Sequence, residues 1–168
     1  MKLLVVSDLH NNIFYTKKII EIFKSDTFFK LLILGDIGIE SIKLLNPFAN
    51  KILAVRGNND GYSNEDSISK FDLPLINHII FNNLRIYFTH GHIYNENNFP
   101  ASYDVLLLGH YHISYIYKKG HSFVANPGSI SLPRDNYHSY MIIDNQGIKI
   151  YDINTTKIVN SICLNKED

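Results

Sequence analysis

The chain has 168 residues, of which 45% are hydrophobic and 19% are charged, a composition that is typical of globular proteins and excludes a disordered or low-complexity chain. Its 16 basic and 16 acidic residues balance, which excludes a broad positive field for nucleic acid or anionic lipid. Because the chain has one cysteine, no signal-peptide pattern and no apolar run near the about 18 residues that span a bilayer, we expect a single cytoplasmic domain over residues 1–168, with no membrane partner.

The first part of the chain predicts strands that end in polar loops. Apolar runs occupy residues 2–6, 31–34 and 51–55. Helical spacing of apolar residues follows the first two runs, in residues 13–23 and 39–48. A loop is expected at residues 62–70, beyond the third run.

From residue 75 the pattern changes to short β-rich runs separated by turns. The runs occupy residues 75–81, 84–89, 105–108, 113–117, 122–124, 137–143 and 148–153. Turns such as Asn82-Asn83 between such runs are typical of hairpins. Residues 158–168 carry no clear signal. Early βα units followed by a strand-rich second half predict an α/β fold with two packed sheets and helices on their outer faces.

Residue types that bind metals recur where the predicted strands end. They are Asp8, His10, Asp36, Asn58, His90, His110 and His112. Taken singly, Asp8 and Asp36 are explained as helix caps and Asn58 as a turn residue. Because open α/β sheets bind ligands outside the carboxyl ends of their strands, the whole set favours a shared metal site. Carboxylate, imidazole and amide ligands together suit Mn, Fe or Zn, and the absence of a thiolate from the set excludes a zinc-finger centre.

Five short motifs carry a family resemblance. They are Asp8-Leu9-His10, Gly35-Asp36, Gly57-Asn58-Asn59-Asp60, Thr89-His90-Gly91-His92 and Gly109-His110-Tyr111-His112. In this order they resemble the sequence blocks of calcineurin-like metallophosphoesterases. Residues 126–134 resemble a further block of the small bacterial and archaeal phosphodiesterase branch, which is related to the retromer-subunit-like proteins of eukaryotes.

The resemblance implies a fold, a cofactor and a reaction. The fold is a four-layer αββα sandwich of two mixed β-sheets flanked by helices. The cofactor is a pair of divalent ions, expected to be Mn with Ni, Fe, Co or Zn as alternatives. One ion is held by Asp8, His10 and His112, the other by Asn58, His90 and His110, with Asp36 bridging. The implied reaction is hydrolysis of a phosphodiester by in-line attack of a hydroxide that bridges the ions.

One position departs from the larger family members, which usually carry His where this chain has Asn59. A neutral amide donates a hydrogen bond but does not deliver a proton, and the small phosphodiesterase branch also lacks this His. His92 is a candidate substitute donor, with a hydrogen bond to a ligand or a surface role as alternatives. Arg134 is a candidate for contacting phosphate oxygens, against the commoner role of an exposed arginine. Asn59, His92 and Arg134 are therefore the predicted catalytic residues.

Three functions follow from these patterns. The leading hypothesis is a phosphodiesterase acting on a small phosphodiester. The alternatives are a scaffold protein on the same fold with a vestigial metal site, and a nuclease acting on short oligonucleotides, although the charge balance gives no strong nucleic-acid signal. Homo-oligomer formation stays open.

Overall fold

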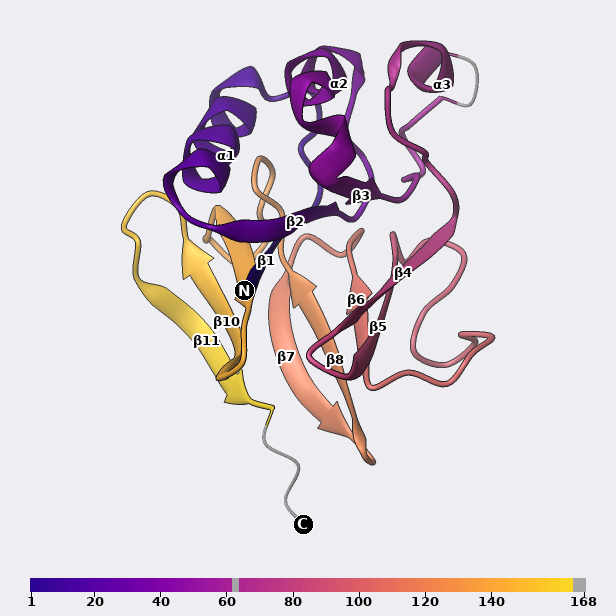
Figure 1. The fold of residues 1–168 in the computed structure, drawn as a ribbon, viewed down its shortest axis with the longest axis vertical. Coiled ribbons are helices and arrows are strands. Elements are labelled where there is room, and N and C mark those ends of the chain that lie inside the picture. The colour runs from indigo at the N-terminus through magenta and orange to yellow at the C-terminus, as the bar shows by residue number, and fades with distance from the viewer. Residues whose placement is uncertain (62–63, 165–168) are drawn as a thin grey trace.

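The computed structural model describes residues 1–61 and 64–164, and Figure 1 shows the arrangement of its elements. The helices are α1 (Ile13–Ser25), α2 (Ile39–Leu45), the 3₁₀ helix η1 (Asn46–Lys51) and α3 (Asn64–Ile68). The strands are β1 (Lys2–Val6), β2 (Phe28–Ile33), β3 (Ile52–Ala54), β4 (Ile76–Phe81), β5 (Leu84–Thr89), β6 (Val105–Leu108), β7 (Ser114–Lys119), β8 (Ser122–Pro127), β9 (Ser139–Ile143), β10 (Gly147–Asp152) and β11 (Ile158–Cys163). Within the described residues, no helix is long and apolar enough to pass through a membrane.

The strands form two mixed sheets, as the sequence predicts. The first has the order β11-β10-β9-β1-β2-β3 and the second the order β4-β5-β6-β8-β7. Strands β1, β2 and β3 run parallel in the first sheet, and β5, β6 and β8 run parallel in the second. The remaining neighbours pair antiparallel. Each sheet therefore carries a set of parallel strands with carboxyl ends on one edge.

Alternation along β1 explains how the first sheet is buried on both faces. Leu4 and Val6 pack with α1 and α2, whereas Leu3 and Val5 lie between the two sheets. Side chains of a strand alternate between faces, so an unbroken apolar run supplies both layers. In Figure 1, α1 and α2 lie next to each other over β2. The predicted helical layer is thus present on the first sheet.

The outer face of the second sheet has a different cover. Leu106, Leu108 and Val124 are fully buried there, and Phe99 and Tyr103 from the segment between β5 and β6 pack against them. The helices of the described residues all precede β4. Side chains from a long connection thus make the outer layer on this side.

One local prediction was wrong, and one strand was not predicted. Residues 64–68 form α3 where a loop was predicted, because five residues offer too few apolar positions to show a helical period; residues 62 and 63 of that predicted loop lie outside the described part. Residues 158–163 form β11, which carried no signal. This strand lies at the edge of its sheet and most of its side chains are exposed, so it lacks clean alternation.

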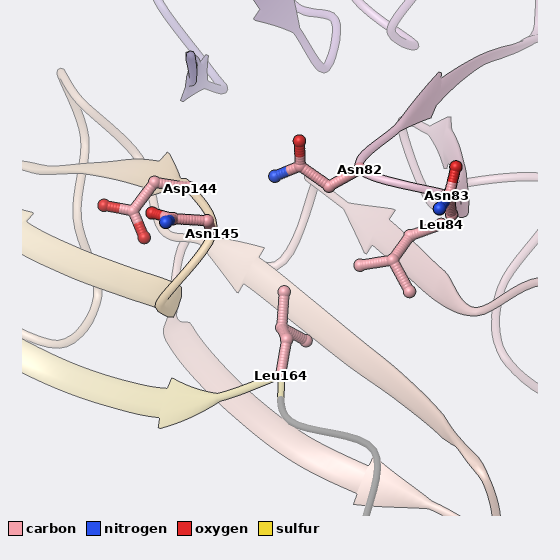
Figure 2. A pocket seen from close by; sticks show the side chains of 6 residues that line it. All are labelled: Asn82, Asn83, Leu84, Asp144, Asn145 and Leu164. Carbon is pink, nitrogen blue, oxygen red and sulfur yellow. The ribbon is translucent and has the colours of Figure 1, made fainter.

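A pocket lies at the end of the molecule away from the predicted metal ligands. It has a volume of ≈ 320 Å³ and is lined by Asn82, Asn83, Leu84, Asp144, Asn145 and Leu164. Figure 2 shows the β4–β5 turn on one side, the β9–β10 turn on the other and Leu164 extending toward the space between them. These turns precede the amino ends of β5 and β10, whereas the predicted metal ligands follow the carboxyl ends of β1, β2, β3, β5 and β6.

Candidate metal centre

All seven predicted ligands follow the carboxyl ends of parallel strands. Asp8 and His10 follow β1, Asp36 follows β2, and Asn58 follows β3 in the first sheet. In the second sheet, His90 follows β5, and His110 and His112 follow β6. Each sheet thus contributes ligands to the same edge, where the two sets meet.

The first cluster contains Asp8, His10 and His112. The Oδ1 atom of Asp8 lies 3.1 Å from Nε2 of His112 and 3.7 Å from Nε2 of His10. The two imidazole Nε2 atoms are 3.2 Å apart. Atoms that bind one ion at about 2.0–2.2 Å must lie within about 4 Å of one another. These three side chains meet that condition.

The second cluster contains Asn58, His90 and His110. The Oδ1 atom of Asn58 lies 3.1 Å from Nε2 of His90 and 2.9 Å from Nδ1 of His110. Asp36 stands between the clusters, because its Oδ2 atom is 3.5 Å from Nε2 of His90 and 3.7 Å from Nε2 of His10. A carboxylate in this position is able to serve two ions at once.

Asp8 carries an oxygen that a positive charge would stabilise. Its side chain is fully buried, and Oδ2 accepts hydrogen bonds from Ser7 Oγ at 2.5 Å and from the backbone N–H of His110 at 3.2 Å. Among the described residues, Oδ1 has no hydrogen-bond partner. A buried, unpartnered carboxylate oxygen is costly. A cation bound among Asp8, His10 and His112 would satisfy it, so the donor set fits a metal.

Five of the ligands have left-handed backbones. The φ angles are 56° at Asp8, 45° at His10, 51° at Asp36, 68° at His110 and 60° at His112. Each such residue costs about 1–3 kcal/mol and persists only where its surroundings impose it. Here the loops are joined by backbone hydrogen bonds, such as that from His10 to Asp36 at 2.8 Å. Five of the ten non-glycine residues with positive φ in the described part of the chain are thus predicted ligands.

Backbone carbonyls orient two of the imidazoles. Nδ1 of His90 lies 2.6 Å from the carbonyl oxygen of Leu34, and Nδ1 of His112 lies 2.7 Å from that of Leu132. When Nδ1 donates its proton to the carbonyl, Nε2 is left with a free lone pair directed at the clusters. Both rings are therefore oriented with Nε2 available as a possible ligand atom.

The motif at residues 126–134 supports the ligand loops from behind. Asn126 Nδ2 donates to the carbonyl of Gly109 at 2.8 Å, and the hydroxyls of Ser129 and Ser131 donate to the carbonyl of Asp8 at 3.0 and 3.1 Å. This supporting role could not be found from the sequence, because it depends on which carbonyls lie next to the motif in the fold.

Asp60 is a further residue whose role sequence reasoning missed. It is buried, and its carboxylate accepts from the backbone N–H groups of Gly57 at 2.8 Å, Ile37 at 2.8 Å and Gly38 at 3.3 Å. Asp60 thereby ties the loop after β3 to the loop after β2. Its place beside Asn58 and Asn59 in the third motif was the available signal.

Replacing Asp60 by Ala should destabilise the protein by about 2–4 kcal/mol, because the buried N–H groups of Gly57 and Ile37 and the half-buried one of Gly38 lose a charged acceptor. Urea unfolding of metal-free protein, followed by circular dichroism, measures the change. Asp144→Ala is the matched control: its carboxylate also accepts two backbone N–H groups, but in an exposed turn where water replaces it. Equal losses in the two variants would contradict the role assigned to Asp60.

Asn59 contacts the shared carboxylate directly. Its backbone N–H donates to Asp36 Oδ1 at 2.8 Å, and its side-chain Nδ2 donates to Oδ2 at 2.6 Å. Burial raises the pKa of Asp36, but the His90 imidazole and the two donors of Asn59 outweigh it and hold that pKa well below its usual range. His90 and Asn59 together therefore favour the ionised form of Asp36, and the two hydrogen bonds from Asn59 orient its carboxylate.

The other two predicted catalytic residues lie beside the clusters. The His92 ring is 5.3 Å from the His90 ring and 6.2 Å from the His110 ring, centroid to centroid. Burial and the nearby His90 and His110 lower the pKa of His92, so its imidazole is neutral near pH 7. Arg134 is exposed, and its backbone N–H donates to the carbonyl of His112 at 2.8 Å. Both residues are placed at the rim and not among the ligand atoms.

Comparison with known proteins supplies the family. A model of the calcineurin-like phosphoesterase superfamily domain matches residues 1–147. Phosphodiesterase YfcE of Escherichia coli K12 is 31% identical over 182 aligned residues, covering 98% of this chain and 99% of that protein. The solved structure of YfcE from E. coli superposes with a TM-score of 0.91 at 30% identity, over 98% of this chain and 100% of that one.

A more distant structure shares the fold alone. Vps29 of Chaetomium thermophilum has a TM-score of 0.75 at 20% identity, covering 96% of this chain and 97% of that one. The matched region of the superfamily model contains all seven predicted ligands and the three residues beside them. The resemblance recognised in the five motifs is confirmed: this chain belongs to the calcineurin-like phosphoesterase superfamily.

Proposed function

We propose that this protein is a phosphodiesterase that works with two divalent cations. The observation that carries the proposal is the convergence of two ligand sets on Asp36, next to the unpartnered Oδ1 atom of buried Asp8. Asp8, His10 and His112 would hold one cation, Asn58, His90 and His110 the other, with Asp36 shared. The relationship to Phosphodiesterase YfcE supports the choice of a diester substrate.

The ligand types support the cofactor. When bound, a pair of divalent cations provides an acidified water for in-line attack on phosphorus and offsets the charge of the phosphate oxygens. The two carboxylates, Asp8 and Asp36, would reduce the repulsion between the cations. Mn is the ion we expect, with Ni, Fe, Co or Zn as alternatives, because mixed oxygen and imidazole ligands accept all of them.

The residues at the rim would position the substrate. The exposed guanidinium of Arg134 is able to bind two non-bridging phosphate oxygens. Asn59 donates one amide hydrogen to Asp36, and its second amide hydrogen would be available to a bound phosphate. His92, held neutral, is suited to accept a proton and poorly suited to donate one.

The full chain loaded with Mn²⁺ should hydrolyse bis(p-nitrophenyl) phosphate and release p-nitrophenol. Metal-free protein in the presence of a chelator provides the control. A folded protein that shows no turnover with Mn, Ni, Co, Fe or Zn would overturn the proposed function. Calorimetric titration with Mn²⁺ separates the scaffold alternative, since a vestigial site would bind the ion weakly.

The rate should depend steeply on the leaving group. Neither Asn59 nor neutral His92 delivers a proton efficiently near pH 7, so the leaving oxygen departs as an anion. Methyl p-nitrophenyl phosphate should therefore react at least about 100-fold faster than methyl phenyl phosphate, whose leaving group is the weaker acid. The two esters are closely matched in size, and steady-state kcat/KM values give the ratio. Similar values would mean that a side chain protonates the leaving oxygen.

A further inference from the structure

A groove lined with tyrosines begins at the metal centre and runs along the outer face of β7. Tyr115 and Tyr117 occupy alternate positions of the strand and so share a face. Together with Tyr111, Ile113 and Glu96 they line an open groove of ≈ 400 Å³. Tyr111, Ile113 and Tyr117 are 36%, 44% and 38% exposed, which is a large aromatic and apolar area for a surface otherwise balanced in charge.

The groove is continuous with the proposed metal ligands. Tyr111 lies between His110 and His112 in the chain, and its ring centroid is 5.5 Å from that of His110 in an edge-on arrangement. On its other side the Tyr111 ring lies against Gly91, where an added Cβ would meet Cε2 at 3.7 Å. The first ring of the groove thus borders the ligand His110. A phosphate held there would direct one of its ester arms over Tyr111.

The chemistry of the lining selects a flat, neutral group with hydrogen-bond donors. The rings of Tyr115 and Tyr117 have centroids 5.8 Å apart and an interplanar angle of 33°. Tyrosine faces stack on planar heterocycles with little regard to their identity. Glu96 is the charged residue of the lining. Burial and then the negative charge of Glu96 raise the pKa of the Tyr111 and Tyr117 hydroxyls, so the carboxylate acts on both tyrosines of the groove.

The charge of Glu96 also excludes some ligands. Lys119 lies beside Glu96 but directs its Nζ atom to the backbone carbonyl of that residue at 2.7 Å and to Asn97 Oδ1 at 3.3 Å, not to the carboxylate. A second phosphate would therefore meet a negative charge in the groove. Ring N–H and amino groups would instead find an acceptor.

We propose that this groove binds one ester arm of the substrate and that the arm carries a nucleobase, so that the substrates are nucleoside phosphodiesters. The inference rests on the proposed function for the phosphate end of the substrate. It adds Tyr111 and Tyr117 as stacking residues and Glu96 as the acceptor that selects among heterocycles.

Binding measurements test the groove without relying on turnover. Guanosine 5′-monophosphate and ribose 5-phosphate share the sugar and the phosphate and differ in the base. Titration calorimetry on the Mn²⁺-loaded full chain should show at least about fivefold tighter binding of guanosine 5′-monophosphate. The preference should fall to about one in the double variant Tyr111→Ala/Tyr117→Ala. Glu96→Gln should reduce the preference in part, because a neutral amide is a weaker acceptor.

The control is Tyr137→Ala, since Tyr137 is 44% exposed and does not line the groove; it should keep the wild-type preference. Equal affinities of the wild type for guanosine 5′-monophosphate and ribose 5-phosphate would contradict the proposal that the groove binds a nucleobase. An unchanged preference in the double variant would contradict it as well. The two proposals fail separately. A protein that prefers the guanosine ligand but never hydrolyses an aryl diester refutes the phosphodiesterase, whereas turnover without any preference refutes the groove.

Discussion

Asp36→Asn should lower kcat/KM for an aryl phosphodiester at least about 100-fold and weaken Mn²⁺ binding. Replacing a residue that only orients a metal ligand typically reduces metal affinity or activity by about 10- to 100-fold. Asp36 is expected to matter more, because it lies within 3.5–3.7 Å of imidazoles from both clusters. The substitution keeps the size of the side chain and removes the negative charge that two neighbouring cations would share. Steady-state kinetics and calorimetric titration measure the two effects.

Asp26→Asn is the matched control for that variant. Asp26 is an exposed carboxylate that pairs with Lys2 on a surface remote from the ligands, so its loss should leave rate and metal affinity unchanged. Circular dichroism checks that both variants fold. Near-normal activity of Asp36→Asn would show that the two clusters do not share this carboxylate, and the ligand assignment would have to be rebuilt.

Gly57→Ala should destabilise the protein by about 3 kcal/mol or more and disturb metal binding as well. A Cβ atom at Gly57 would lie less than 3.0 Å from the backbone nitrogen and Oδ1 of Asp36, and overpacking of this kind moves backbone. The loops after β2 and β3 would have to separate, taking Asp36 and Asn58 with them. Urea unfolding and Mn²⁺ titration follow the two consequences.

A second glycine variant isolates the steric effect. Gly120 has a φ of 62°, and no heavy atom lies within 4 Å of the position that a Cβ atom would occupy there. Gly120→Ala therefore carries only the left-handed backbone cost of about 1–2 kcal/mol. Its metal affinity should equal that of the wild type. If Gly57→Ala were as stable as Gly120→Ala and bound Mn²⁺ normally, the close approach of the two loops would not matter.

Much of this arrangement was predictable because it depends on local pattern. Apolar runs that stop at Asp8, Asp36 and Asn58 predicted strands with polar loops at their carboxyl ends, and the structure places those loops together. Periodicity also predicted α1, where buried Thr16, Ile19, Ile20 and Phe23 share one face. These features are encoded within a few residues of one another, so a single sequence reveals them.

Other features depend on contacts between segments that are distant in the chain, so no local sequence pattern predicts them. The hydrogen bonds that Asp60 accepts require the backbone of Ile37 and Gly38 to lie next to it in the fold. From the sequence alone, Asp60 would be assigned as a turn residue. The tyrosine groove requires Glu96, which belongs to a long connection without periodicity, to fold over β7. Whether His92 faces a ligand or the solvent likewise follows from packing and not from its motif.

Both clusters draw side chains from the two sheets at once: Asp8 and His10 meet His112, and Asn58 meets His90 and His110. A bound cation would consequently cross-link the two sheets at one end of the sandwich. Part of the metal-binding free energy would then add to the free energy of unfolding, so the stability of the protein would increase with the concentration of the free ion.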